Sequence, residues 1–177
     1  MAGDGLVIIA IDGVDKVGKS TLCKALAEVH GFNVISVDSY RIEGIKMPLD
    51  MRFWGDIPAM AVARLSGVDI LLDRSMLSVL AYNVDPIHPG NKREVYDQLY
   101  PYVGWYKEKV FFVFNTFMDT RTLTERNPEA DWKELVYDNN CFINVYGACG
   151  IDPLVIQAET AISYKMDQIL DFCEYNK

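Results

Sequence analysis

A run of eight residues near the amino terminus has the residue types and spacing of a phosphate-binding loop. Residues 13–20 fit the P-loop pattern G-x-x-x-x-G-K-[ST] at every defined position. The backbone N–H groups of such a loop surround a phosphate chain, its lysine reaches the β- and γ-phosphates, and its hydroxyl ligates Mg²⁺. The pattern therefore assigns the phosphates to Lys19 and the metal to Ser20, with further triphosphate contacts from Gly13, Val17, Gly18 and Thr21.

The elements on either side of this loop are those that a P-loop needs. Residues 6–11 form a short apolar run, which is long enough for a buried strand and too short for a helix. Residues 21–29 carry apolar side chains at the spacing of one helical face, namely Leu22, Ala25, Leu26 and Val29. A strand, a glycine loop and a helix in this order direct backbone N–H groups and the positive end of the helix dipole at a phosphate.

The same alternation of apolar runs and helical stretches continues along the chain. It predicts strands at residues 6–11, 33–38, 68–73, 109–115 and 142–146, and helices at 57–66, 75–83, 94–105, 120–126, 131–139 and 154–175. Residues 39–51 are predicted to be irregular. Strands that alternate with helices favour an α/β protein. We therefore expect a three-layer P-loop NTPase fold, with a five-stranded parallel sheet and helices on both faces, over a single domain of residues 1–177.

The composition excludes several classes of partner. The 177 residues carry a formal charge of −8, which argues against a long nucleic-acid-binding surface but allows basic residues to gather in one cleft. No apolar run is long enough to cross a membrane, and residues 1–5 lack the features of a signal segment. The four cysteines show no metal-like spacing. We expect a cytoplasmic protein with reduced thiols that binds neither a membrane nor nucleic acid stably.

Two stretches resemble the thymidylate kinase family. Residues 12–21, D-G-V-D-K-V-G-K-S-T, are similar to the P-loop of that family, (F/I)-E-G-x-D-x-x-G-K-S-T. Residues 73–82, D-R-S-M-L-S-V-L-A-Y, are similar to the D-R-Y-x-x-S-x-x-A-Y that ends its third strand. The D-R-S variant also resembles the E-R-S motif of the deoxyribonucleoside kinases, a sister family. The resemblance implies ATP as phosphate donor, Mg²⁺ as cofactor, a nucleotide as acceptor and a homodimer.

Two residues of these stretches point to an acceptor. Asp15 would repel a triphosphate, so its carboxylate makes sense facing a second substrate, and the resemblance implies the 3′-hydroxyl of a deoxyribose. Arg74 follows the third strand, where open α/β sheets bind ligands, and could clamp a monophosphate with two N–H bonds. Asp73 would hold Mg²⁺ through water or act as an acid or base. The alternatives are a solvent-facing loop acid and a structural Asp–Arg pair.

Two further cations are candidates for the transition state. Lys16 lies beside the transferred phosphoryl group, where charge must be neutralised. The resemblance implies this role, which an Arg fills in one class of the family, and a plain surface lysine is the alternative. Arg126 belongs to a short lid of about residues 119–133, which would close over the phosphates.

The remaining acceptor contacts follow from the resemblance and from spacing. Arg52 matches a second phosphate-binding arginine, and Trp54 could stack on the base. Ser78 precedes Tyr82 by one helical turn, and the family tyrosine packs under the sugar and disfavours a 2′-hydroxyl. Residues 147–150 are the loop after the predicted fifth strand, where such folds seat adenine.

The segment after the second strand departs from the family. It contains D-S-Y-R in place of R-E-P-G-G, with Asp38 and Arg41 as candidate acceptor contacts. Nucleoside kinases place a carboxylate at Asp38 as base for a 5′-hydroxyl.

Three functions are therefore compatible with the sequence. The first is transfer of the ATP γ-phosphate to a deoxynucleoside monophosphate, with dTMP as the model. The second is a deoxynucleoside kinase that uses Asp38. The third is a non-catalytic nucleotide-binding switch; the guanine-reading N-K-x-D of GTPases is absent from the sequence.

Overall fold

The computed structural model describes residues 6–36, 49–83, 92–126, 128–129 and 131–175. The strands of this part are β1 (Ile8–Asp12), β2 (Asn33–Ser36), β3 (Ile70–Asp73), β4 (Phe111–Thr116) and β5 (Leu154–Gln157). Its helices are α1 (Lys19–His30), α2 (Leu49–Ser66), α3 (Met76–Asn83), α4 (Lys92–Lys107), α5 (Thr120–Arg126), α6 (Trp132–Cys149) and α7 (Ile162–Tyr175). None of the helices described combines the length and the apolar character needed to cross a membrane.

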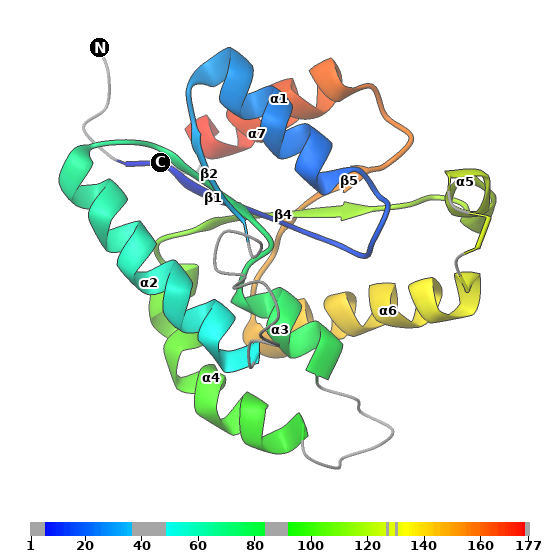
Figure 1. The fold of residues 1–177 in the computed structure, drawn as a ribbon, viewed down its shortest axis with the longest axis horizontal. Coiled ribbons are helices and arrows are strands. Elements are labelled where there is room, and N and C mark those ends of the chain that lie inside the picture. The colour runs from blue at the N-terminus through cyan, green and yellow to red at the C-terminus, as the bar shows by residue number, and fades with distance from the viewer. Residues whose placement is uncertain (1–5, 37–48, 84–91, 127, 130, 176–177) are drawn as a thin grey trace, which may run out of the picture.

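The strands form one parallel sheet in the order β2-β3-β1-β4-β5. Helices α1 and α7 cover one face, and α2, α3, α4 and α6 cover the other (Figure 1). The predicted fold class, a five-stranded parallel sheet with helices on both faces, is confirmed. Ile11 of β1 pairs with Asp73 of β3, so the loops that follow these two strands begin side by side.

The central strand β1 is buried on both faces. Ile9 and Ile11 pack in the cluster under α1 and α7, whereas Ile8 and Ala10 pack in the cluster under the other four helices. A strand that is enclosed on both sides has no polar face, which explains the continuous apolar run in the sequence. The P-loop therefore leaves the sheet from its most buried strand.

The predicted end of the chain is wrong in two elements. Residues 142–146 are not a strand but part of α6, which replaces the predicted helix at 131–139 and continues to Cys149. The β-branched and aromatic side chains of this segment suggested a strand. Its buried residues instead recur at helical spacing: Leu135, Cys141, Phe142, Val145, Tyr146 and Cys149. The fifth strand is β5, whose residues were predicted to be the first turn of a helix at 154–175.

Helix α2 begins earlier than predicted. The sequence indicated a helix from residue 57, with Pro58 in its first turn, and irregular structure up to residue 51. The structure has one helix from Leu49 to Ser66 with Pro58 inside it. Proline is favoured in a first turn and costs a hydrogen bond in a helix interior. A helix that begins at residue 57 would place Pro58 in its first turn, whereas the observed helix contains it in the interior.

The turn from β1 into the P-loop requires glycine. Gly13 has a φ of +142°, and a Cβ built on it would lie 2.1 Å from the backbone oxygen of Asn115 in β4. A side chain at this position would therefore be strained by the backbone conformation and would collide with a neighbouring strand. The loop can lie against β4 only because residue 13 has no side chain.

We expect Gly13→Ala to lower the free energy of unfolding by more than about 3 kcal/mol, because it adds a backbone collision to the strain of a positive φ. Gly67→Ala is the control, since Gly67 has a φ of +67° with open space around its Cβ position. That variant should lose about 1 kcal/mol. Urea unfolding followed by circular dichroism measures both, and equal losses would contradict the role given to the β4 contact.

Candidate active site

A cavity of about 560 Å³ lies at the carboxyl ends of β1 and β3. It is open to solvent on one side and is lined by the P-loop, by α1 and α3, and by Ser36 at the end of β2. Ten of the residues singled out in the sequence line it: Asp15, Lys16, Gly18, Lys19, Ser20, Thr21, Asp73, Arg74, Ser78 and Tyr82. The structure thus brings the two motifs together at one site.

The P-loop is held by contacts to its own backbone and to β4. Lys19 donates from Nζ to the backbone oxygen of Val14 over 2.5 Å, and the Asn115 amide donates to the backbone oxygen of Val17 over 3.0 Å. Lys16 and Gly18 both have positive φ values, of 68° and 88°. Gly18 precedes α1 and, in the part of the chain described, no side chain caps this helix. The first N–H groups of α1 therefore face the cavity available for an anion.

Lys19 is buried in an environment that disfavours its charge. Only 5% of the residue is exposed. Burial, and then repulsion from Arg74, lower the pKa of Lys19 from its ordinary 10.5 to about 8, although nearby carboxylates act in the opposite direction. A desolvated ammonium group with another cation nearby is stabilised by any anion that enters the cavity.

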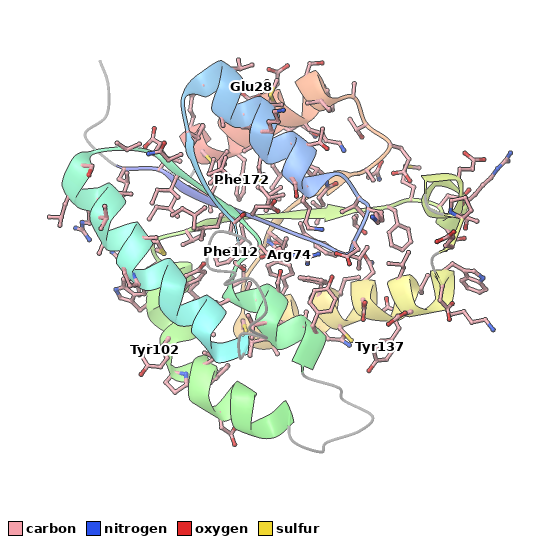
Figure 2. The ribbon with its side chains drawn as sticks, viewed as in Figure 1. Glu28, Arg74, Tyr102, Phe112, Tyr137 and Phe172 are labelled. Carbon is pink, nitrogen blue, oxygen red and sulfur yellow. The ribbon has the colours of Figure 1, made fainter. Side chains whose placement is uncertain are left out.

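Arg74 links the P-loop to Tyr82 of α3. One terminal nitrogen donates to the Gly13 backbone oxygen and to the Tyr82 hydroxyl, each over 3.1 Å, and the other donates to the Asp15 carboxylate. The guanidinium carbon also lies 5.2 Å from the centre of the Tyr82 ring. Figure 2 shows Arg74 near the middle of the molecule. Asp15, which lies 59 positions from Arg74 in the sequence, thus forms one cluster with Arg74 and Tyr82.

The charges of this cluster are fixed by its contacts. Burial lowers the pKa of Arg74, but Tyr82 and Asp15 outweigh burial and leave the pKa above its ordinary value. Burial raises the pKa of Tyr82, although Arg74 acts against this rise. At neutral pH the site therefore presents a charged guanidinium and a neutral phenol.

The sequence reasoning missed Asp12. This carboxylate is fully buried and accepts hydrogen bonds from Ser75 N (2.8 Å), Ser75 Oγ (2.5 Å), Ser78 Oγ (2.5 Å) and Tyr146 Oη (3.0 Å). Ser78 was expected to contact the acceptor; it lines the cavity, but its hydroxyl is bound to Asp12. The available signal was a carboxylate that ends an apolar strand directly before Gly13.

Several predicted residues cannot be located as side chains. Asp38 and Arg41 lie outside the described residues. Arg52 and Trp54 belong to α2 and Arg126 ends α5, but their side chains are not among those described. Of the predicted lid at 119–133, the structure describes α5 and the start of α6, where Asp131 caps the helix by accepting from the backbone N–H of Lys133.

The prediction that residues 147–150 form a loop after the fifth strand is wrong. Residues 147–150 end α6, where Gly150 is the C-cap, and do not follow a strand. Gly150 lines a second cavity together with Leu6, Val110 and Phe111, which precede or begin β1 and β4 at the opposite edge of the sheet. The error follows from the wrong fifth strand. The segment that follows β5 is residues 158–161, where the Ala158 N–H donates to the Thr116 backbone oxygen over 2.7 Å.

Comparisons with known proteins establish the fold. No family model and no curated protein sequence matches the chain. Thymidylate kinase from Candida albicans superposes with a TM-score of 0.64 and 17% identity, covering 97% of this chain and 92% of that one. Deoxyadenosine kinase from M. mycoides, with the products dCMP and dCDP bound, superposes with a TM-score of 0.57 and 15% identity. The match covers 97% of this chain and 100% of that one.

A third similar structure is the YorR protein from Bacillus subtilis in complex with phosphorylated GDP. It gives a TM-score of 0.60 and 13% identity, and the match covers 96% of this chain and 97% of that one. At such identities the likeness concerns the fold. The resemblance expected from the sequence, to thymidylate kinases and to their sister family, is thus confirmed at the level of the P-loop kinase fold.

The lowered pKa of Lys19 predicts a pH-dependent stability. Between pH 8 and 10.5 the unfolded chain holds a proton on Lys19 that the folded chain has lost, so this residue makes stability rise with pH in that window. Below pH 8 the folded protein carries the full cost of the buried charge, which Lys19→Met removes. The free energy of unfolding of this variant, relative to wild type, should therefore fall by on the order of 2 kcal/mol from pH 7 to 10.

Urea unfolding of the nucleotide-free protein at four pH values measures this difference. Lys24→Met is the matched control, because Lys24 lies on the same helix with 77% of its side chain exposed. Its difference from wild type should not change over the range. A constant difference for Lys19→Met as well would contradict the assignment of a buried, charge-strained lysine.

Proposed function

We propose that this protein transfers the γ-phosphate of ATP to a deoxynucleoside monophosphate, with dTMP as the model acceptor, to give the diphosphate. The proposal rests mainly on one observation: Lys19, which is buried, and Arg74, which is half-buried, come from different strand ends and meet at one cavity in a protein of net charge −8. Bringing a desolvated lysine close to an arginine costs free energy, which a bound phosphate would offset. Cations from two sides suit two phosphate groups.

The P-loop side would hold the ATP phosphates. Gly13, Val17, Gly18 and Thr21 supply the loop and helix start, and Lys19 would exchange the Val14 carbonyl for phosphate oxygens. Ser20 is exposed and lines the cavity with Asp73, so one hydroxyl and one carboxylate are available to a hard cation. This donor set fits Mg²⁺, which keeps several waters and is completed by phosphates. When bound, Mg²⁺ would neutralise charge on the β- and γ-phosphates.

The Arg74 side would hold the acceptor. The guanidinium would turn from Asp15 to the acceptor phosphate, and Asp15 would then accept the sugar hydroxyl. Tyr82 lies against Arg74 and lines the same cavity, as a residue that selects the sugar must. Further contacts are proposed for Ser78, Asp38, Arg41, Arg52 and Trp54.

The reaction then needs little covalent chemistry from the protein. An oxygen of the acceptor phosphate attacks the γ-phosphorus, and the bond from that phosphorus to the β–γ bridging oxygen breaks, which leaves ADP. Lys19, Lys16, Arg74 and, from the lid, Arg126 would neutralise the transferring group. A monophosphate attacks as an anion, so no general base is required.

A deoxynucleoside kinase is the second candidate. It is favoured by the serine that follows Arg74, as in the E-R-S motif, and would use Asp38 to accept the proton of a 5′-hydroxyl. A nucleotide-binding switch remains a third hypothesis, but it would have no use for an acceptor cluster of Asp15, Arg74 and Tyr82.

We further propose that the protein acts in cytoplasmic nucleotide biosynthesis as a homodimer. Apolar side chains are exposed on α2 (Val62 and Leu65) and on α4 (Tyr102 and Trp105), helices that both pack on α3. Tyr102 is marked in Figure 2. Such exposed groups on neighbouring helices are the kind of surface that a second copy could cover.

A competition assay separates the candidates. With ATP and Mg²⁺ and equal concentrations of dTMP and thymidine, we expect dTMP to be consumed and thymidine to remain, because Arg74 offers a charge to a phosphate. Product formation is followed by chromatography, and Lys19→Ala should abolish it. Turnover of thymidine alone would make the protein a nucleoside kinase. If no deoxy- or ribonucleoside monophosphate or nucleoside is turned over, the kinase proposal is wrong.

Arg74→Ala tests the acceptor clamp. Loss of hydrogen bonds to a charged phosphate should raise the acceptor KM by about 10- to 100-fold, while the KM for ATP stays nearly unchanged. Arg64→Ala, on the exposed side of α2, is the matched surface control and should alter neither value. Steady-state kinetics with each substrate varied in turn gives both constants. A rise confined to the KM for ATP would show that Arg74 belongs to the donor site.

A further inference from the structure

The buried carboxylate of Asp12 needs an explanation beyond the fold. Its four hydrogen-bond donors are a backbone N–H and three hydroxyl groups. Burying a carboxylate is costly unless its oxygens are well satisfied. A neutral side chain at the end of an apolar strand would avoid this cost altogether, so the charge must serve a purpose that an apolar residue could not.

Asp12 acts on the residue next to Arg74. Arg74 has a φ of +79°, a conformation that costs an L-residue about 1–2 kcal/mol. Its N–H donates to the Ile11 backbone oxygen over 3.2 Å, and the following residue, Ser75, is bound to Asp12 through both its N–H and its hydroxyl. The strained residue is therefore fixed on both sides by the end of β1.

The same carboxylate fixes the helix that begins there. The Ser75 hydroxyl accepts a hydrogen bond from the Leu77 N–H over 3.0 Å, and Ser78 reaches Asp12 from the next position on the same face. The negative charge lies at the positive end of the α3 dipole, which favours it. Asp12 thus sets where α3 starts and how the chain enters it.

Tyr146 connects Asp12 to α6. Its ring packs against Phe114 and Phe112, and its hydroxyl donates to Asp12. Burial, and then the Asp12 carboxylate, raise the pKa of Tyr146 well above its ordinary value, so the phenol stays protonated and remains a donor. One carboxylate therefore connects β1, α3 and α6 directly behind Arg74.

We propose that Asp12 is a positioning residue for the acceptor site. It holds Arg74 in the left-handed conformation, which places the guanidinium on Gly13 and Asp15 at the cavity, and it does so through Ser75, Ser78 and Tyr146. The acceptor role of Arg74 rests on the proposed function, but the positioning of its side chain does not. Asp12 itself touches neither phosphate.

Three variants of the full-length protein test this. Asp12→Asn removes the charge at constant size, and Tyr146→Phe removes one donor while keeping the ring. Thr116→Val is the matched control: it removes the 2.8 Å hydrogen bond from Thr116 Oγ1 to Asn139, which also connects a strand to α6 but does not involve Arg74. Thermal unfolding first establishes that each variant is folded.

The first readout is independent of any substrate. The NMR signal of the Arg74 Nε–H, identified by its loss in Arg74→Ala, should lie away from the position of free arginine in wild type. It should move toward that position in Asp12→Asn, move less in Tyr146→Phe, and stay in Thr116→Val. An unchanged signal in Asp12→Asn overturns the proposal.

The second readout is binding by calorimetry. We expect the dissociation constant of dTMP to rise about tenfold in Asp12→Asn and about threefold in Tyr146→Phe, with that of ATP unchanged. Equal weakening of both ligands would show a merely structural role and overturn the proposal. If wild type binds no dTMP while the Arg74 signal still moves in Asp12→Asn, the positioning holds and the proposed acceptor is wrong.

Discussion

The parallel pairing of β1 with β3 is the constraint on which the site depends. Ile11 lies opposite Asp73, so both strands end at the same level and their loops begin side by side. The P-loop contributes Lys19 and Asp15, and the turn after β3 contributes Arg74. Asp15 and Arg74 lie 59 positions apart in the chain, yet all three residues line one cavity. A parallel sheet makes this arrangement general, because all carboxyl ends gather at one edge. The particular chemistry then depends on which side chains follow each strand.

The cavity stores electrostatic strain that a ligand can release. Lys19 is desolvated and repelled by Arg74, whereas the rest of the protein is acidic. A surface of net negative charge slows the approach of anions, so the proposed phosphate binding would depend on the local field of Lys19 and Arg74. In the described structure, Lys19 donates a hydrogen bond to the Val14 carbonyl and Arg74 donates one to the Asp15 carboxylate. Both partners are contacts that a phosphate oxygen could replace.

Local patterns predicted the parts of the fold and site that local residues determine. The P-loop could be recognised in the sequence because backbone geometry requires its glycines and phosphate binding requires a lysine at position 19. Residues 142–146 were misjudged because side chains that suit a strand also suit a buried helix face, and only packing against the sheet decides between them. That error moved the fifth strand and the expected adenine loop. Asp12 was missed for a related reason, since all four of its donor groups belong to residues more than sixty positions away.

Under the proposed function, the exposure of Asp15 would let Arg74 pair with Asp15 in the free protein and with phosphate in the bound protein. Its side chain is 68% exposed, against 17% for Arg74, so their ion pair is well solvated on one side and contributes little net stability. A phosphate can offer the guanidinium two charged oxygens and replace this contact at small cost. The same exposure leaves Asp15 open to a hydroxyl group once Arg74 turns away. This exchange requires a fixed backbone at Arg74, because a mobile backbone would lose conformational entropy when phosphate binds and so weaken the binding. In our proposal, the buried hydrogen bonds of Asp12 to Ser75, Ser78 and Tyr146 hold that backbone in place.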